Sequence, residues 1–140
     1  MSPLDPQTAC ERPNGSERLL RAIVDSMPTQ MWFGRPDGAA DFLNRQWLDY
    51  TGLSADQALG WKWIEAIHPD DRPALVEHWQ NLLRLGASGE IEARLRRADG
   101  EYRWFLLSAY PLHDESGSVL RWCGANTDID DRKGAATEAR

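Results

Sequence analysis

Few side chains in this sequence have the type and spacing that chemistry requires, and His78 is the foremost candidate. A neutral imidazole is a common metal ligand. His78 stands next to Trp79 at the edge of an apolar stripe, however, and that position is typical of a packed histidine. His68 precedes the same helical stretch, and His113 falls in a polar loop. Packing is therefore favoured over metal ligation for His78.

The adjacent carboxylates Asp70 and Asp71 resemble a general acid–base pair. They precede Pro73 and an apolar-periodic stretch, so capping of the first turn of a helix explains them. The sequence contains no Gly-rich phosphate loop, no Ser/His/Asp set and no cluster with metal-ligand spacing. These observations favour a non-catalytic chain, and a small hydrolase that uses the two carboxylates is the weaker alternative.

The cysteines and the charge balance restrict the class of protein. Cys10 and Cys123 stand far apart and match no disulfide or metal framework, which favours a reducing, cytoplasmic compartment. The net charge is -6, and acidic residues interleave with the arginines of residues 94–103, so we expect no nucleic-acid binding. The sequence shows no signal peptide and no apolar run near the ~20 residues of a membrane span, so we expect no membrane insertion.

The elements that must position these residues follow from periodicity and helix breakers. Residues 1–15 carry three prolines and no periodicity, and we expect a disordered lead there. Ser16 is the predicted cap of an amphipathic helix that ends at Pro28. Residues 29–35 and 40–43 then form a predicted hairpin.

The middle of the chain changes to a helical period. Asn44 caps a predicted short helix, and Ser54 with Gln57 forms a capping box for another. Residues 61–67 add a helical turn or two. A longer predicted helix follows and ends at Gly86.

The last third is predicted to be β-structure. Residues 90–97 alternate apolar and charged side chains, and residues 101–110 are apolar on both faces, as in a central strand. Residues 111–117 form a predicted polar loop before a strand at residues 118–127, and the charged tail from Asp128 is helix-prone. Strands in hairpins with the helices inserted as a block favour an antiparallel α+β domain.

Six short sequence words occur in the order that is typical of one family. They are WFGRPDG (32–38), NRQWLDYTG (44–52), SADQALG (54–60), IHPDDR (67–72), RADGEYRW (97–104) and GANTDIDDR (124–132). Over roughly residues 16–133 the chain resembles the PAS domain family, in particular its Trp-rich branch. The resemblance implies an α+β fold with a five-stranded antiparallel sheet in strand order 2-1-5-4-3, helices on one face and an N-terminal amphipathic helix.

The resemblance also implies a function. PAS domains sense ligands, redox state or light, or dimerise, and pass the result to an attached output domain. We expect a PAS domain at residues 16–128 and the start of a helical linker at residues 129–140. Because the chain begins at Met1 and breaks off in a charged helix, we expect the N-terminal input domain of a sensor histidine kinase, with a cyclic-dinucleotide (diguanylate) cyclase as the second candidate for the output.

The predicted signal exit is the word Asp128-Ile129-Asp130, which is similar to the family's Asp-Ile-Thr with Asp130 in place of the Thr. This replacement leaves the helical exit intact but changes its local hydrogen bonding.

Aromatic side chains are the candidates for the wall of a ligand pocket. The candidates are Trp47, Trp61, Trp63, Trp79 and Trp104, with His78 beside them. Most Trp residues of a small domain belong to its core, so we expect an interior with little room and no cofactor. A haem-dependent gas or redox sensor that uses His78 is the alternative. The family's cysteine-based flavin photochemistry requires a Cys in the helical block, and residues 60–65 contain none.

The first predicted helix carries an apolar stripe with two interpretations. Its members are Leu19, Leu20, Ile23, Val24 and Met27. The stripe covers the open face of its own sheet, or it pairs with the same helix of a second chain, and amphipathicity alone does not decide between these. In the family both occur, and we expect a homodimer.

Overall fold

The computed structural model describes residues 15–133. All of the predicted lead except Gly15, and residues 134–140 of the predicted linker, lie outside them. In chain order the elements are α2 (Gly15–Ser26), β1 (Gln30–Gly34), β2 (Ala40–Leu43), α3 (Arg45–Thr51), α4 (Ala55–Ala58), the 3-10 helix η1 (Lys62–Ala66), α5 (Arg72–Leu85), β3 (Gly89–Arg96), β4 (Tyr102–His113) and β5 (Val119–Asp128).

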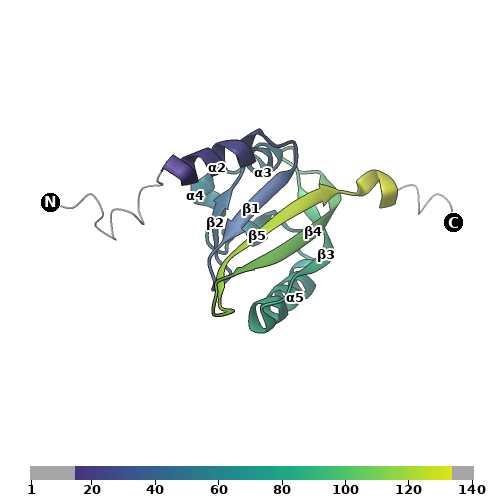
Figure 1. Cartoon of the computed structure of the whole chain (residues 1–140). Coiled ribbons are helices and arrows are strands. Elements are labelled where there is room, and N and C mark those ends of the chain that lie inside the picture. The colour runs from purple at the N-terminus through teal and green to yellow at the C-terminus, as the bar shows by residue number, and fades with distance from the viewer. Residues whose placement is uncertain (1–14, 134–140) are drawn as a thin grey trace.

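The five strands form one antiparallel sheet in the order β2-β1-β5-β4-β3. The predicted strand order is confirmed. The helices from α3 to α5 occupy the connection between the β1–β2 hairpin and the other three strands. In Figure 1, α2 lies at one end of the sheet beside α3, and α5 lies at the other end below β3.

Local capping explains the short helices. The Asn44 side chain accepts a hydrogen bond from the Trp47 amide at the start of α3, and Gly52 ends that helix with a left-handed φ of 73°. Ser54 and Gln57 form the predicted capping box of α4. These predictions are confirmed. Ser16, by contrast, lies inside α2, so its predicted role as the cap is wrong.

Strand β4 is longer than the sequence predicts. It continues through Pro111 to His113, where a polar loop is expected from the sequence. Pro111 pairs with Trp122 of β5, whereas β3 pairs with β4 only as far as Ala109 opposite Gly89. The proline therefore lies beyond the end of β3, where its missing N–H costs no ladder hydrogen bond.

A row of paired residues across the sheet sets the shape of the interior. It runs from Leu43 through Trp32, Gly124 and Ala109 to Gly89. The Trp32 indole lies directly on Gly124, since a Cβ built there would be 2.3 Å from the indole ring. The three small residues of this row, Gly124, Ala109 and Gly89, thus leave space for indoles and for α5.

The interior is rich in indoles. Trp79 of α5 makes edge-on contacts with Trp32 and Trp122, with ring centroids 5.6 and 4.8 Å away. Trp47 and Phe105 belong to the adjoining apolar cluster around α3 and η1. Because α5 packs its buried face on this set, the long helix and the last three strands enclose one core.

Asn44 joins the first helix to the sheet. It is fully buried, and its Nδ2 donates to the Val24 and Thr29 carbonyls at 3.0 and 2.9 Å. Its Oδ1 accepts from the amides of Met31, at 3.0 Å, and Trp47, at 3.3 Å. One side chain therefore satisfies groups from the end of α2 to the start of α3.

No helix within residues 15–133 combines the length and the apolar character that crossing a bilayer requires.

Candidate ligand cavity and signal exit

A cavity of about 70 Å³ lies between α5 and the sheet. Four indoles from separate elements form much of its wall: Trp32, Trp47, Trp63 and Trp79. An apolar cavity of about 150 Å³ is large enough for benzene, so this cavity takes a molecule of only a few non-hydrogen atoms. The sequence predicts an interior with little room, and the cavity is small, although the side chains do not fill it completely.

His78 gives this apolar cavity its free polar atom. Its Nε2 is buried and has no hydrogen-bond partner in the described part of the chain. The other polar side chains of the wall are engaged: Asn126 donates to Gln30 at 3.3 Å, and the Ser108 hydroxyl donates to Glu90 at 3.2 Å. A buried unpaired nitrogen is costly, so a bound hydrogen-bonding group at this position would be stabilised.

The structure brings together four of the six pocket candidates, whereas Trp61 and Trp104 are not part of the cavity wall. Trp47, Trp63, His78 and Trp79 line the cavity. Trp104 lies outside it, on β4 beside the charged groups of Arg94 and Lys133. Periodicity alone does not distinguish the two faces of a strand whose middle is apolar on both sides, so Trp104 was indistinguishable from a cavity residue.

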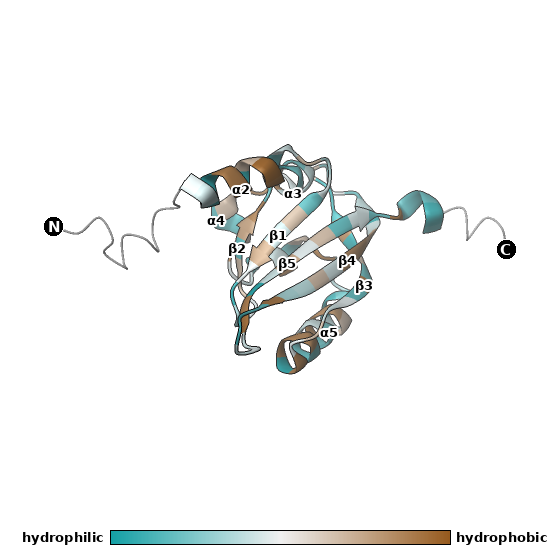
Figure 2. Ribbon diagram, in the orientation of Figure 1, coloured by the Kyte–Doolittle hydropathy of each residue, from teal (hydrophilic) through white to brown (hydrophobic). Residues whose placement is uncertain are grey.

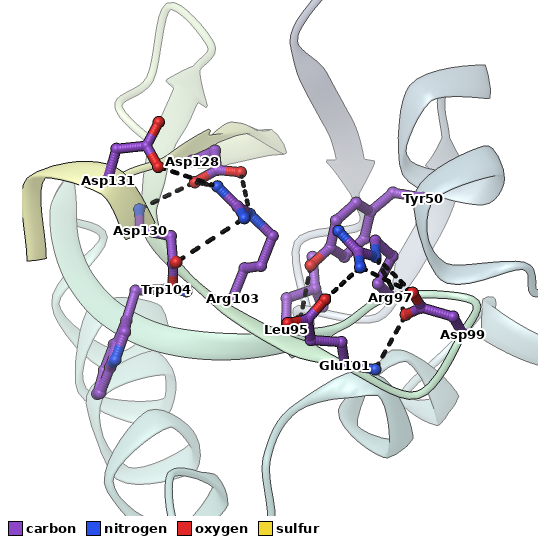
Figure 3. Close-up of polar contacts among 10 residues, drawn as sticks. All are labelled: Tyr50, Leu95, Arg97, Asp99, Glu101, Arg103, Trp104, Asp128, Asp130 and Asp131. Atoms are coloured by element: carbon purple, nitrogen blue, oxygen red, sulfur yellow. Dashed lines mark hydrogen bonds and ion pairs between the residues drawn. The ribbon is translucent and has the colours of Figure 1, made fainter. Parts of the chain in front are cut away.

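Arg103 binds the chain where it leaves the sheet. Its Nε lies 2.8 Å from an Asp128 carboxylate oxygen, and its guanidinium is 3.8 Å from Asp130 and 3.6 Å from Asp131. Figure 3 shows the guanidinium among these three carboxylates. The hydrogen bond to Asp128 raises the pKa of Arg103. One cation thus fixes the end of β5 and the helical turn at residues 130–133 to β4.

Trp104 completes the attachment of the exit. Its amide donates to the Asp130 carboxylate at 3.0 Å, and its carbonyl accepts from the Ile129 amide at 2.9 Å. Its indole lies 4.9 Å from the Arg94 guanidinium and 4.6 Å from the Lys133 ammonium. Asp130, in the position of the expected Thr, therefore keeps an acceptor for the Trp104 amide and adds a charge near Arg103.

Asp71 does not cap α5 through its side chain, so the predicted explanation of this residue is wrong. No side-chain capping bond is present at that helix start. The carboxylate instead receives the Arg94 guanidinium at 3.0 and 2.9 Å and the Arg94 amide at 2.8 Å. The guanidinium hydrogen bonds hold the pKa of Asp71 below its ordinary value. The partner is 23 positions away, which is why a local reading attributes Asp71 to capping.

Asp70 lies apart from this ion pair. Its side chain is 77% exposed, and its amide donates to His68 Nδ1 at 3.1 Å. Asp70 and Asp71 therefore do not converge on a shared proton. Within residues 15–133, no three His, Cys, Asp or Glu side chains are grouped so as to hold a metal ion.

The apolar face of α2 is largely open to solvent. Leu19, Leu20, Ile23 and Met27 are exposed, whereas Val24 is buried, and Figure 2 shows brown segments along this helix. Val24 therefore belongs to the domain's own core and is excluded from the predicted contact surface. The other four residues form a surface that we name the α2 face.

The family model for the PAS fold matches residues 40–126, which include most of the sheet, the helices α3 to α5 and all of the cavity wall except Trp32 and Gly38. The chain belongs to the PAS family. The PAS domain is a sensory fold that is generally non-catalytic, and the structural roles of Asp70 and Asp71 agree with that.

Two known proteins are similar in sequence to this PAS domain over most of its length. The chain is 37% identical over 123 residues to the uncharacterized protein y4lL of Sinorhizobium fredii, which covers 88% of this chain and 15% of that protein. It is 38% identical over 121 residues to the peroxide stress-activated histidine kinase mak1 of Schizosaccharomyces pombe, which covers 86% of this chain and 7% of the kinase. The chain thus spans less than a sixth of either relative.

Among solved structures, the fold is similar to the N-terminal domain of a diguanylate cyclase with PAS/PAC sensor from Marinobacter aquaeolei. The TM-score is 0.67 at 21% identity, with 75% of this chain and 98% of that domain covered. The sheet, the helical block and the strand order are therefore those of an entire PAS domain.

The cavity of this PAS domain does not fit haem. Ligand pockets for molecules of drug or cofactor size measure roughly 300–1,000 Å³, several times the 70 Å³ found between α5 and the sheet.

Cys123 is not placed for flavin photochemistry or for ready oxidation. It pairs with Phe33 and Tyr110 in the sheet row next to that of Gly124, so its side chain points to the sheet face away from the cavity. Burial raises the pKa of its thiol, and a thiol with a raised pKa reacts slowly.

Proposed function

We propose that this PAS domain is the sensory input and dimerisation module of a longer, cytoplasmic signalling protein whose output is a histidine kinase. The proposal is supported above all by mak1, a histidine kinase that is 38% identical over 86% of this chain while this match takes up 7% of mak1. The module itself performs no chemistry in this proposal. Its contribution is a cavity at one side of the sheet and a firmly attached exit at the other.

The coding sequence after Arg140 tests the attached output. We expect a continuous helix leading into a histidine-kinase domain. A cyclase domain in that place would replace the kinase as the output, and a stop codon directly after Arg140 would refute the proposal of an attached output altogether.

The ligand in this proposal is a small, mainly apolar molecule with one hydrogen-bonding group for His78 Nε2. The indole walls favour apolar atoms, and the unpaired imidazole nitrogen favours one polar contact. The small volume excludes larger metabolites unless the cavity widens.

Native mass spectrometry of the protein as isolated tests the ligand. We expect a small non-covalent mass increment that is lost in His78→Leu, which keeps the volume but removes the polar atom. Xenon binding to the emptied cavity is the second measurement, and it should persist in His78→Leu because apolar volume alone governs it. A protein without bound mass that also fails to bind xenon refutes the ligand part and leaves the dimerisation part.

The dimer contact in this proposal is the α2 face. Exposed apolar residues grouped on one helix are typical of an interaction surface, and in the PAS family this helix pairs with its own copy. Leu19→Glu should therefore convert a dimer to a monomer in analytical ultracentrifugation. Leu85→Glu is the matched control, because Leu85 of α5 is also 63% exposed. A wild-type protein that is already monomeric, or loss of the dimer in the control alone, contradicts this assignment.

A further inference from the structure

We propose that Arg94 is the positioning residue that couples the cavity helix α5 to the exit segment at residues 128–133. This inference deepens the proposed function, because it names the route by which a change at the cavity reaches the output. It concerns how the cavity regulates the output, and it depends on the contacts of the Arg94 side chain with Asp71 and Trp104.

The first contact is the ion pair of Arg94 with Asp71. Two guanidinium nitrogens, at 3.0 and 2.9 Å, bind the two carboxylate oxygens in a fork. The Asp71 side chain is only 16% exposed and that of Arg94 only 28%, so solvent screens this pair less than a surface pair. The start of α5 is therefore fixed to β3 at this point.

The second contact is that of Arg94 with Trp104. The guanidinium lies 4.9 Å from the centre of the indole, and the Lys133 ammonium of the exit turn lies 4.6 Å from the same ring. Lys133 also forms an ion pair with Glu92 of β3. A change in the position of Arg94 thus changes the ring environment on which the exit turn rests.

Helix α5 connects this junction to the cavity. Leu75 follows Asp71 by one helical turn, is buried, and lines the cavity together with His78 and Trp79. A ligand that displaces α5 in order to fit would also move Asp71, the N-cap residue of this helix, whose carbonyl accepts from the Leu75 amide at 3.0 Å. Transmission requires that the ligand bind the two helix positions unequally.

Arg103 does not provide this route. Its ion pairs join β4 to the carboxylates of the exit, which are Asp128, Asp130 and Asp131, and none of them reaches α5. Arg103 therefore fixes the exit, whereas Arg94 contacts both α5 and the aromatic ring under the exit. This distinction makes the inference testable without any ligand.

Hydrogen exchange of two exit amides in the 140-residue chain measures the coupling. The Ile129 amide donates to the Trp104 carbonyl and the Lys133 amide to the Ile129 carbonyl, each at 2.9 Å, so both are protected while the exit is attached. In Asp71→Asn, which keeps the shape but loses the charge, both amides should exchange about three- to tenfold faster, the effect of weakening a contact of this kind.

Asp99→Asn is the matched control. Asp99 forms the neighbouring ion pair with Arg97 in the β3–β4 turn, at 2.7 Å, and has no contact with Trp104 (Figure 3). It should leave the two exit amides at the wild-type rate relative to the sheet amides of β1 and β5. Arg94→Lys, which keeps the charge but loses the fork, should reproduce the effect of Asp71→Asn.

Three results would overturn the coupling. They are wild-type exchange of the exit amides in Asp71→Asn, equal acceleration in the Asp99→Asn control, and an acceleration shared by all sheet amides, which would mean only lower global stability. If the proposed ligand is refuted, the coupling is still supported when the exit amides exchange faster in Asp71→Asn and at the wild-type rate in Asp99→Asn.

Discussion

Replacement of Asn44 by Asp probes the connection between the first helix and the sheet. The amide nitrogen of Asn44 donates to the Val24 and Thr29 carbonyls, and its oxygen accepts from the Met31 and Trp47 amides. Each net bond of this kind contributes about 1 kcal/mol, so Asn44→Ala, which removes all four, should lower the free energy of unfolding by about 4 kcal/mol.

Asn44→Asp keeps the acceptor oxygen but replaces the donating nitrogen by a second oxygen, which in the ionised form faces the Val24 and Thr29 carbonyls. The ionised form should therefore cost at least as much as the alanine, whereas the protonated form donates one bond again. The pKa of this carboxyl is consequently higher in the folded protein than in the unfolded chain. In the pH range between these two values the folded protein holds a proton that the unfolded chain has lost, so stability falls as the pH rises.

Urea unfolding followed by tryptophan fluorescence at pH 5, 6, 7 and 8 measures this effect. The deficit of Asn44→Asp relative to the wild type should be largest at high pH. It should shrink toward pH 5 by as much as about 1.4 kcal/mol per pH unit in the range where one proton is linked. Asn81→Asp is the control, since Asn81 is exposed on α5, and it should stay within about 0.5 kcal/mol of the wild type. A deficit that does not change with pH would refute the reasoning.

Three further outcomes follow from packing and burial. Gly124→Ala should destabilise the domain by at least about 3 kcal/mol in urea unfolding, because the new Cβ would lie 2.3 Å from both the Ser108 carbonyl and the Trp32 ring; near-wild-type stability would contradict the packing of Trp32 on this glycine. Burial raises the pKa of Tyr50 to about 12, so its phenol should ionise late in an ultraviolet titration, and its contribution to stability should be complete below its ordinary pKa of about 10 and be lost between there and pH 12. Cys123 should react with a thiol reagent more slowly than an unfolded-chain cysteine, as measured by peptide mapping at neutral pH, because its pKa is raised by burial; equal rates would contradict that placement.

Local chemistry explains why much of the fold was predictable. The Asn44 cap, the capping box of Ser54 and Gln57, and the helix end at Gly86 each depend on residues within one helical turn. Alternation along residues 90–97 likewise predicts a strand without reference to its neighbours. The order of the strands came from the resemblance to PAS domains, since local patterns do not specify which strands pair.

The sequence could not predict the features that depend on distant partners. Pro111 is tolerated in β4 only because β3 pairs no further than Gly89, and no local pattern shows where a neighbouring strand stops. The sequence shows the apolar stripe of α2 but not which of its residues are buried, and Val24 is buried beside α3, whose Asn44 cap binds the Val24 carbonyl. In both cases a contact between separate elements decides the outcome.

The sequence by itself determined most of the element types, the caps of α3 and α4 and the family, because these depend on side-chain propensities and on spacings of a few residues. Only the tertiary structure decided that Asp71 pairs with Arg94, that Trp104 lies under the exit turn, and that about 70 Å³ remains between α5 and the sheet. An ion pair across 23 positions and a space left between packed side chains are properties of how the elements meet. They are fixed by the distances between those elements, which no single segment of the chain contains.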